Sequence, residues 1–200
     1  HLEKEDLTFY LQITRGVYQR MLSFPNKQIE PTVLFSVNKI INDMSVYRKG
    51  VQVVSVEDKR WGHCDTKTLS LISNVLAHQE AVEKEGKFGI FVKDGILTEG
   101  ANVSVFGVKN DVVVTHPASK NILPGITRMV VTMLCSENSI ELNEQAIKLN
   151  EVGNLDEMFV VGTTPEICPV LRFDDQVIGS GVPGKTTKQL QKAFDVLVNR

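Results

Sequence analysis

Four short apolar runs in the middle of the chain are joined in pairs by tight turns. Asp94-Gly95 separates the first pair, and this dipeptide is typical of two-residue hairpin loops. Lys109-Asn110-Asp111 separates the second pair. The four runs cover residues 88–92, 96–98, 103–106 and 112–114. This pattern predicts strands linked by hairpins rather than the alternating strand and helix units of a doubly wound fold.

Hydrophobic spacing predicts further strands and three helices outside this region. The longest predicted helix covers residues 68–85, where Leu69, Ile72 and Leu76 recur near helical spacing and Gly86 follows the end. The other predicted elements are helices over 125–138 and 186–199 and strands over 8–14, 32–37, 51–56, 158–162, 168–173 and 176–178. Because strands outnumber helices and most are joined by hairpins, the predicted fold class is α+β.

A domain boundary is predicted after the first two strands. From Asn38 to Lys49 the alternation weakens and charge rises, before Gly50 opens another strand. The chain is therefore divided into residues 1–42 and 43–200. The first part is too short for a core of its own. We expect it either to pack on the rest or to be the end of a small domain whose beginning is missing.

Charge and composition exclude several classes of protein. The 22 Lys and Arg residues nearly balance the 24 Asp and Glu residues, so the sequence has no excess of positive charge that would favour binding to nucleic acid or an anionic membrane. No apolar run approaches the ~20 residues of a membrane-spanning helix. Three cysteines without close spacing argue against a disulfide framework, and the four histidines lack metal-ligand spacing. We expect a soluble, cytoplasmic protein without a metal site.

The most conspicuous local motif is the glycine-rich run Gly179–Thr186. It fits the letters of both the P-loop and the dinucleotide-binding fingerprint, and it lies between a predicted strand and a predicted helix. However, only one predicted helix follows it, so the later acidic strand end that holds Mg²⁺ is missing, and Pro183 removes a backbone donor. The favoured interpretation is a turn that leads into the last helix. Nucleotide binding with Lys185 is the alternative.

Four quieter motifs carry residue types that suit one another chemically. Lys67 precedes the predicted long helix, where partial burial would favour the neutral, nucleophilic amine, although a solvated lysine at the start of a helix is the favoured interpretation of this residue taken alone. Glu99 ends a hairpin strand and, taken alone, is a charge at the rim of the sheet. Gly125 opens a helix whose free N–H groups suit a phosphate, and Thr163 and Thr164 end a strand with hydroxyl groups that suit the same anion.

Together and in this order, these motifs resemble the class IV aminotransferases, the fold-type IV enzymes that use pyridoxal 5′-phosphate (PLP). The pattern is most similar to D-amino-acid aminotransferases in three stretches, Gln12–Gly16, Asp65–Ala81 and Thr115–Ala118. The resemblance extends over essentially the whole sequence and closes with Phe159–Ile167. It implies the remnant of a small α/β domain, followed by a larger, barrel-like mixed-sheet domain with helices that binds PLP. It also implies a homodimer that acts on an amino acid and a 2-oxo acid.

The resemblance assigns the cofactor to six residues. Lys67 would form the Schiff base with PLP and move the proton during transamination, and Glu99 would contact the pyridine nitrogen, which keeps the ring protonated as an electron sink. The remaining contacts would be Leu123 on the ring face and Ile126, Thr127 and Thr163 on the phosphate.

The substrate assignments are less regular. Arg20 would bind the substrate carboxylate across the dimer interface, and Thr164 would also contact substrate. Leu22 stands where D-amino-acid aminotransferases of the best-known type have a histidine. No residue matches the phosphate-binding arginine or the substrate-binding tyrosine that the family carries in a further N-terminal segment.

These departures leave three functions open. The first is transamination, with a D-amino acid such as D-alanine favoured. The second is aminodeoxychorismate lyase of the folate pathway, which uses the same scaffold and which Leu22 keeps open. The third is a truncated, catalytically incompetent fragment with a weak cofactor site.

Overall fold

The computed structural model describes residues 7–40 and 45–198. It divides into two compact units, His1–Asp43 and Met44–Arg200, which are described separately. The predicted boundary between residues 42 and 43 falls outside the described residues, and the roles given to 1–42 and 43–200 stay predictions. Within the described ranges, no helix is both long and apolar enough to cross a membrane.

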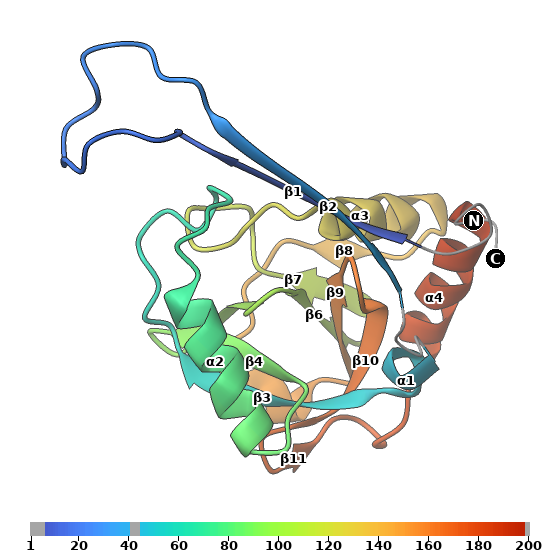
Figure 1. Ribbon diagram of the computed structural model, residues 1–200. Coiled ribbons are helices and arrows are strands. Elements are labelled where there is room, and N and C mark those ends of the chain that lie inside the picture. Colours follow the sequence, from blue (N-terminus) through green and yellow to red (C-terminus); the bar gives the residue numbers. More distant parts are fainter. Residues whose placement is uncertain (1–6, 41–44, 199–200) are drawn as a thin grey trace. The chain divides into compact units, whose positions relative to one another are not determined.

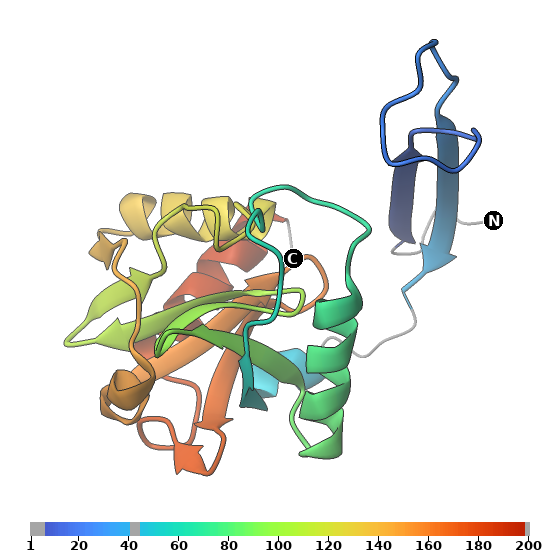
Figure 2. The same ribbon diagram turned by 90° about the vertical axis from the view of Figure 1, so that its left-hand side faces the viewer.

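The first unit contains an antiparallel pair of strands, drawn in blue in Figure 2. The pair consists of β1 (Leu7–Thr14) and β2 (Thr32–Lys39), which confirms both predicted strands. Phe9 and Phe35 stack with their ring centroids 5.8 Å apart, yet both side chains are exposed within this unit. The hairpin therefore presents an apolar face that its own two strands cannot cover.

The second unit is built on one mixed sheet that curls into a half-barrel (Figure 1). Along the sheet the strands follow the order β5-β4-β3-β10-β9-β6-β7-β8, and β11 pairs with β10. Strand β3 is parallel to both of its neighbours, whereas the β4–β5, β6–β7 and β9–β10 pairs are antiparallel. The strands are β3 (Val51–Glu57), β4 (Phe88–Lys93), β5 (Ile96–Gly100), β6 (Ser104–Lys109), β7 (Val112–Thr115), β8 (Leu142–Asn143), β9 (Glu157–Gly162), β10 (Glu166–Phe173) and β11 (Gln176–Val177).

Helices cover this sheet in two groups (Figures 1 and 2). Helix α2 packs on β3 and β4, while α3 and α4 pack against each other and against β9. The helices are α1 (Ser45–Lys49), α2 (Ile72–Glu83), α3 (Ile126–Glu137) and α4 (Lys185–Leu197), with a 3₁₀ helix η1 (Leu149–Asn154). The predicted strands, the helices α3 and α4, and the α+β class are confirmed. The short elements α1, β8 and η1 were not predicted.

The core has two sides because side chains alternate along each strand. On β9, Met158 and Val160 contribute to one buried cluster and Phe159 and Val161 to the other, where helices α3 and α4 pack. Phe159 stacks on Phe106 with parallel rings 5.0 Å apart. Burial of an aromatic side chain of this kind stabilises a fold by about 1.5–3 kcal/mol, so this cluster anchors α3 firmly on the sheet.

The tight turns follow from local backbone chemistry. Asp94 and Gly95 both have positive φ angles, 51° and 76°, as a two-residue hairpin turn of type I′ requires. Asn110 and Asp111 repeat this geometry at 51° and 62°. Glycine, asparagine and aspartate tolerate this region better than other residues, which explains why these turns could be recognised in the sequence.

The predicted helix over 68–85 is shorter than expected. It begins at Ile72, because Thr68 Oγ1 accepts a hydrogen bond from the backbone N–H of Ser70 at 3.1 Å and forms a local turn instead. Leu69, whose spacing suggested the earlier start, is 53% exposed. The buried residues of the helix are Ala77 and Ala81. The segment before Ile72 is consequently a loop, and this loop contributes to the cavity described next.

Candidate active site

A cavity of about 520 Å³ lies in the second unit, where several chain segments converge. It is bounded by the end of β5, the start of β6, the end of β9, the first turn of α3 and the loop between β3 and α2. Six of the predicted site residues line it: Lys67, Glu99, Leu123, Ile126, Thr127 and Thr163. Residues separated by almost one hundred positions in the sequence thus face one space, as the resemblance implies.

One predicted site residue of the same unit, Thr164, does not line this cavity. Thr164 follows Thr163 in the turn after β9 and is exposed. Arg20 belongs to the first unit, where it is also exposed. Their roles in substrate binding stay predictions.

Lys67 lies in the loop before α2, not directly at its start. Its side chain is exposed, which agrees with the favoured interpretation of a solvated lysine and not with the partly buried alternative. Among the described residues, none forms a hydrogen bond or ion pair with its ammonium group. The amine is therefore free to react with a molecule in the cavity.

Glu99 is buried, with only 7% of its surface exposed, so its interpretation as a rim charge is wrong. It occupies the next-to-last position of β5, and one oxygen accepts a hydrogen bond from the backbone N–H of Leu123 at 3.1 Å. The other oxygen pairs with the guanidinium of Arg60. Burial raises the pKa of Glu99, and the charge of Arg60 offsets part of this effect.

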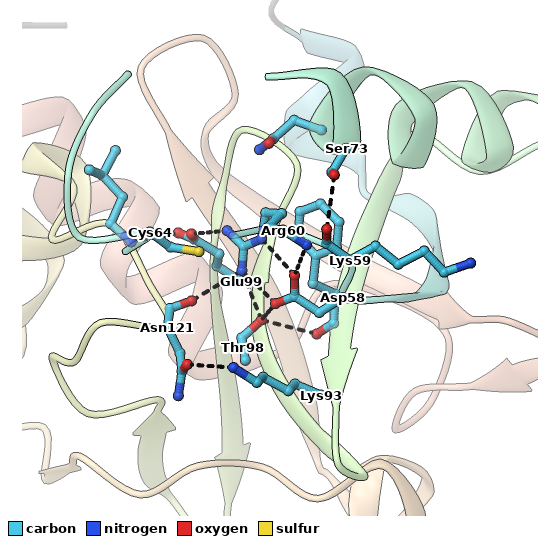
Figure 3. A network of polar contacts seen from close by, with 12 residues as sticks. Asp58, Lys59, Arg60, Cys64, Ser73, Lys93, Thr98, Glu99 and Asn121 are labelled. Carbon is cyan, nitrogen blue, oxygen red and sulfur yellow. Dashed lines mark hydrogen bonds and ion pairs between the residues drawn. The ribbon is translucent and has the colours of Figure 1, made fainter. Parts of the chain in front are cut away.

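Arg60 and Asp58 complete a buried network that the sequence did not predict (Figure 3). Arg60 Nη2 donates to Asp58 Oδ2 at 2.7 Å and Nε donates to Asp58 Oδ1 at 2.9 Å. Burial alone would raise the pKa of Asp58, but the hydrogen bonds and charge of Arg60 hold it below its ordinary value. The sequence feature that could have indicated this network is the charged segment of residues 57–60, directly after a predicted apolar strand.

The first turn of α3 has unused hydrogen-bond donors at the cavity. Its N-cap, Gly125, has no side chain to cap the helix, and Ile126 and Thr127 form the first turn. Behind them, Arg128 Nη2 donates to the carbonyl oxygen of His116 at 3.0 Å and to Oε1 of Glu144 at 2.6 Å, whereas its Nε has no partner. No other buried side-chain nitrogen or oxygen of the described residues lacks a partner. The free N–H groups and the helix dipole together favour an anion at this turn.

The glycine-rich run before α4 is different. The carboxylate of Glu157 accepts hydrogen bonds from the backbone N–H groups of Thr186 and Thr187, both at 2.8 Å. A Cβ atom at Gly184 would lie 2.0 Å from Cδ of Glu157, so this glycine makes room for the carboxylate. The donors that a P-loop would offer to phosphate are already used, and the nucleotide interpretation is not supported.

Comparison with known proteins agrees with this geometry. The model of the family described as amino-transferase class IV matches residues 1–173. The chain belongs to the class IV aminotransferase family. The chain is 39% identical over 192 residues to a D-alanine aminotransferase of Bacillus licheniformis, an alignment that covers 96% of this chain and 68% of that protein.

Solved structures share the fold. The branched-chain amino acid aminotransferase of Escherichia coli superimposes with a TM-score of 0.83 at 27% identity, over 94% of this chain and 64% of that one. The fold-type IV transaminase of Curtobacterium pusillum gives a TM-score of 0.80 at 22% identity, over 97% of this chain and 66% of that one. The chain thus spans about two thirds of the length of the proteins that it matches.

Proposed function

We propose that this protein is a PLP-dependent aminotransferase that moves the amino group of a D-amino acid, such as D-alanine, to a 2-oxo acid. One observation carries the proposal: the free amine of Lys67, the buried carboxylate of Glu99 and the open first turn of α3 line a single cavity. The relative from Bacillus licheniformis, a D-alanine aminotransferase, supports this choice of substrate.

The donor set fits PLP, whose ring acts as an electron sink when it is bound. The backbone N–H groups of Ile126 and Thr127 and the hydroxyl group of Thr127 would hold the phosphate, assisted by the hydroxyl group of Thr163 and by the dipole of α3. Arg128 lines the same cavity and has an unused donor at Nε, while its charge is paired with Glu144. Leu123 would pack on the ring face. Membership of the class IV aminotransferase family supports a cofactor of this type.

Two side chains would carry the chemistry. Lys67 would hold the cofactor covalently through Nζ, and its amine would move a proton to and from the substrate Cα. Glu99 would hold a proton on the pyridine nitrogen, because an ionised carboxylate in a buried site stabilises a neighbouring cation. Exposure of Lys67 at the cavity leaves a path for the substrate.

Substrate recognition involves residues beyond this cavity. Arg20 would bind the substrate carboxylate as a planar, bidentate donor from the partner copy of a homodimer, and Thr164 would contact the substrate beside Thr163. Leu22 cannot donate a hydrogen bond as the histidine of other family members does, so we expect weaker carboxylate binding. We propose that the enzyme works in the cytoplasm.

The test uses the full-length protein with PLP and measures amino transfer from D-alanine and from L-alanine to 2-oxoglutarate. We expect transfer from D-alanine, its loss in Lys67→Ala, and no change in the control Lys59→Ala, whose ammonium pairs at 3.0 Å with Glu57 on the surface. Release of pyruvate from aminodeoxychorismate without amino transfer would establish the lyase instead. Absence of PLP binding would overturn both and indicate an incompetent protein.

A further inference from the structure

Arg60 occupies an unusual position below the cavity, between two carboxylates. Its side chain is 6% exposed, and those of Asp58 and Glu99 are 5% and 9% exposed. The guanidinium lies over the ring of Phe91, with Cζ 4.1 Å from the ring centroid. Burial of three charged groups is unfavourable unless each is paired, so this arrangement needs a reason beyond stability.

The hydrogen bonds of Arg60 connect three separate segments. It is held by Asp58 after β3, it contacts Glu99 on β5, and it donates to the carbonyl oxygen of Asn121, ahead of α3, at 3.0 Å (Figure 3). The segment after Asn121 supplies the N–H group of Leu123 that binds the second oxygen of Glu99. Both oxygens of Glu99 are thereby fixed, and Arg60 contributes to each constraint.

The charges of this network do not cancel. Two carboxylates share one guanidinium, which leaves an excess negative charge where Glu99 meets the cavity. The other charged groups that line the same cavity, Lys67 and Arg128, are directed to other roles in the proposed function. A protonated ring nitrogen would supply the missing positive charge.

We propose that Arg60, anchored by Asp58, is a positioning residue that fixes the Glu99 carboxylate at the cavity wall and keeps it ionised for the pyridine nitrogen of PLP. This inference rests on the proposed function. Arginine suits the task because its planar fork binds Asp58 through two nitrogens while a third nitrogen contacts Glu99. Lysine would keep the charge but could not reproduce this geometry.

The test compares Arg60→Met and Arg60→Lys with Arg48→Met in the full-length protein. Arg48 is a matched control because it also pairs with two carboxylates, those of Glu166 and Asp195, but does not line the cavity. Two properties are measured at neutral pH: the Kd for PLP, and the ¹⁵N chemical shift of bound PLP labelled at the ring nitrogen, which reports directly whether that nitrogen carries a proton.

We expect the wild type and Arg48→Met to show a protonated ring nitrogen. In Arg60→Met the ¹⁵N chemical shift should move toward the value of an unprotonated ring nitrogen. The Kd for PLP should rise about tenfold, the factor that corresponds to a change of one unit in the pKa of Glu99. Arg60→Lys should fall between them. If Arg60→Met does not fold, Arg60→Lys and Asp58→Asn decide the question, because both keep a positive charge but loosen its geometry.

A wild-type shift and Kd in the folded Arg60 variants would overturn the inference and leave the proposed function intact. Failure of the wild-type protein to bind PLP would overturn the proposed function itself. A loss of stability without a change in the ¹⁵N shift would assign Arg60 a purely structural role and would also overturn the inference.

Discussion

Helices α3 and α4 have the same type of N-cap residue, yet their first turns differ in what they can bind. Each helix follows a glycine, Gly125 or Gly184, that offers no capping side chain. At α4 the carboxylate of Glu157 occupies the N–H groups, whereas at α3 they remain open to the cavity. A helix terminus can bind an anion only while its donors are unused, so the less conspicuous motif carries the site.

The largest expected effect is on kcat, and it distinguishes Lys67, which lines the cavity beside α3, from Lys185, which begins α4. Lys67→Ala should lower kcat by roughly 10⁴-fold, because it removes the group that moves the proton. Lys185→Ala, at the first position of α4, should leave kcat unchanged. Steady-state transamination by full-length protein measures both. Equal losses in the two variants would contradict the distinction.

The first turn of α4, whose N–H groups are bound by Glu157, should govern stability rather than cofactor binding. Glu157→Ala should lower the free energy of unfolding by about 2 kcal/mol, since it removes the cap of α4 and leaves buried donors without partners. The Kd for PLP should not change. Urea denaturation and PLP titration test this prediction, with the exposed Glu151→Ala as control. Weaker PLP binding without a loss of stability would count against the assigned role of Glu157.

The first turn of α3, which lines the cavity, should govern cofactor binding rather than stability. Thr127→Ala should weaken PLP binding about tenfold, because it removes the hydroxyl group that would bind the phosphate, and one hydrogen bond to a charged group contributes about 1.5 kcal/mol. The stability of the protein without PLP should change by less than about 0.5 kcal/mol. Fluorescence titration with PLP and urea denaturation separate the two quantities. An unchanged Kd would place the phosphate elsewhere.

The smallest effect concerns the pH dependence of stability without cofactor. Burial raises the pKa of Glu99 above its unfolded value, so the folded state loses stability as pH rises from the unfolded pKa through the folded one. Glu99→Gln removes this loss. The difference in unfolding free energy between Glu99→Gln and wild type should therefore become more positive from pH 4 to pH 7, by about 1.4 kcal/mol for each unit by which the pKa is raised.

Urea denaturation at both pH values measures this difference. Glu151→Gln is the control, because Glu151 is half exposed in a surface pair with Lys148. A difference of the opposite sign would show that burial of Glu99 favours its ionised form.

How much the sequence could predict depends on the range of the interactions. The turns at Asp94-Gly95 and Asn110-Asp111 obey local backbone rules, so they were found. The start of α2 was not, because Leu69 continues the helical spacing without being buried. The residues facing the cavity were found through a resemblance, since no periodicity relates Lys67 to Glu99.

The Arg60 network depends on tertiary structure. Arg60 and Glu99 are 39 positions apart and meet because β3, β4 and β5 are neighbours in the sheet. No local rule states this order, and a charged residue after a strand is ordinarily solvated. The burial of Glu99 was missed for the same reason.

Borohydride reduction of the full-length protein with PLP, followed by peptide mass mapping, tests the central claim most directly. Reduction makes the bond between PLP and the amine that holds it permanent, so the labelled residue is read from a mass spectrum. We expect the label on Lys67, in the loop before α2. A label on Lys185 or any other lysine, or none in protein that transfers amino groups, would contradict it.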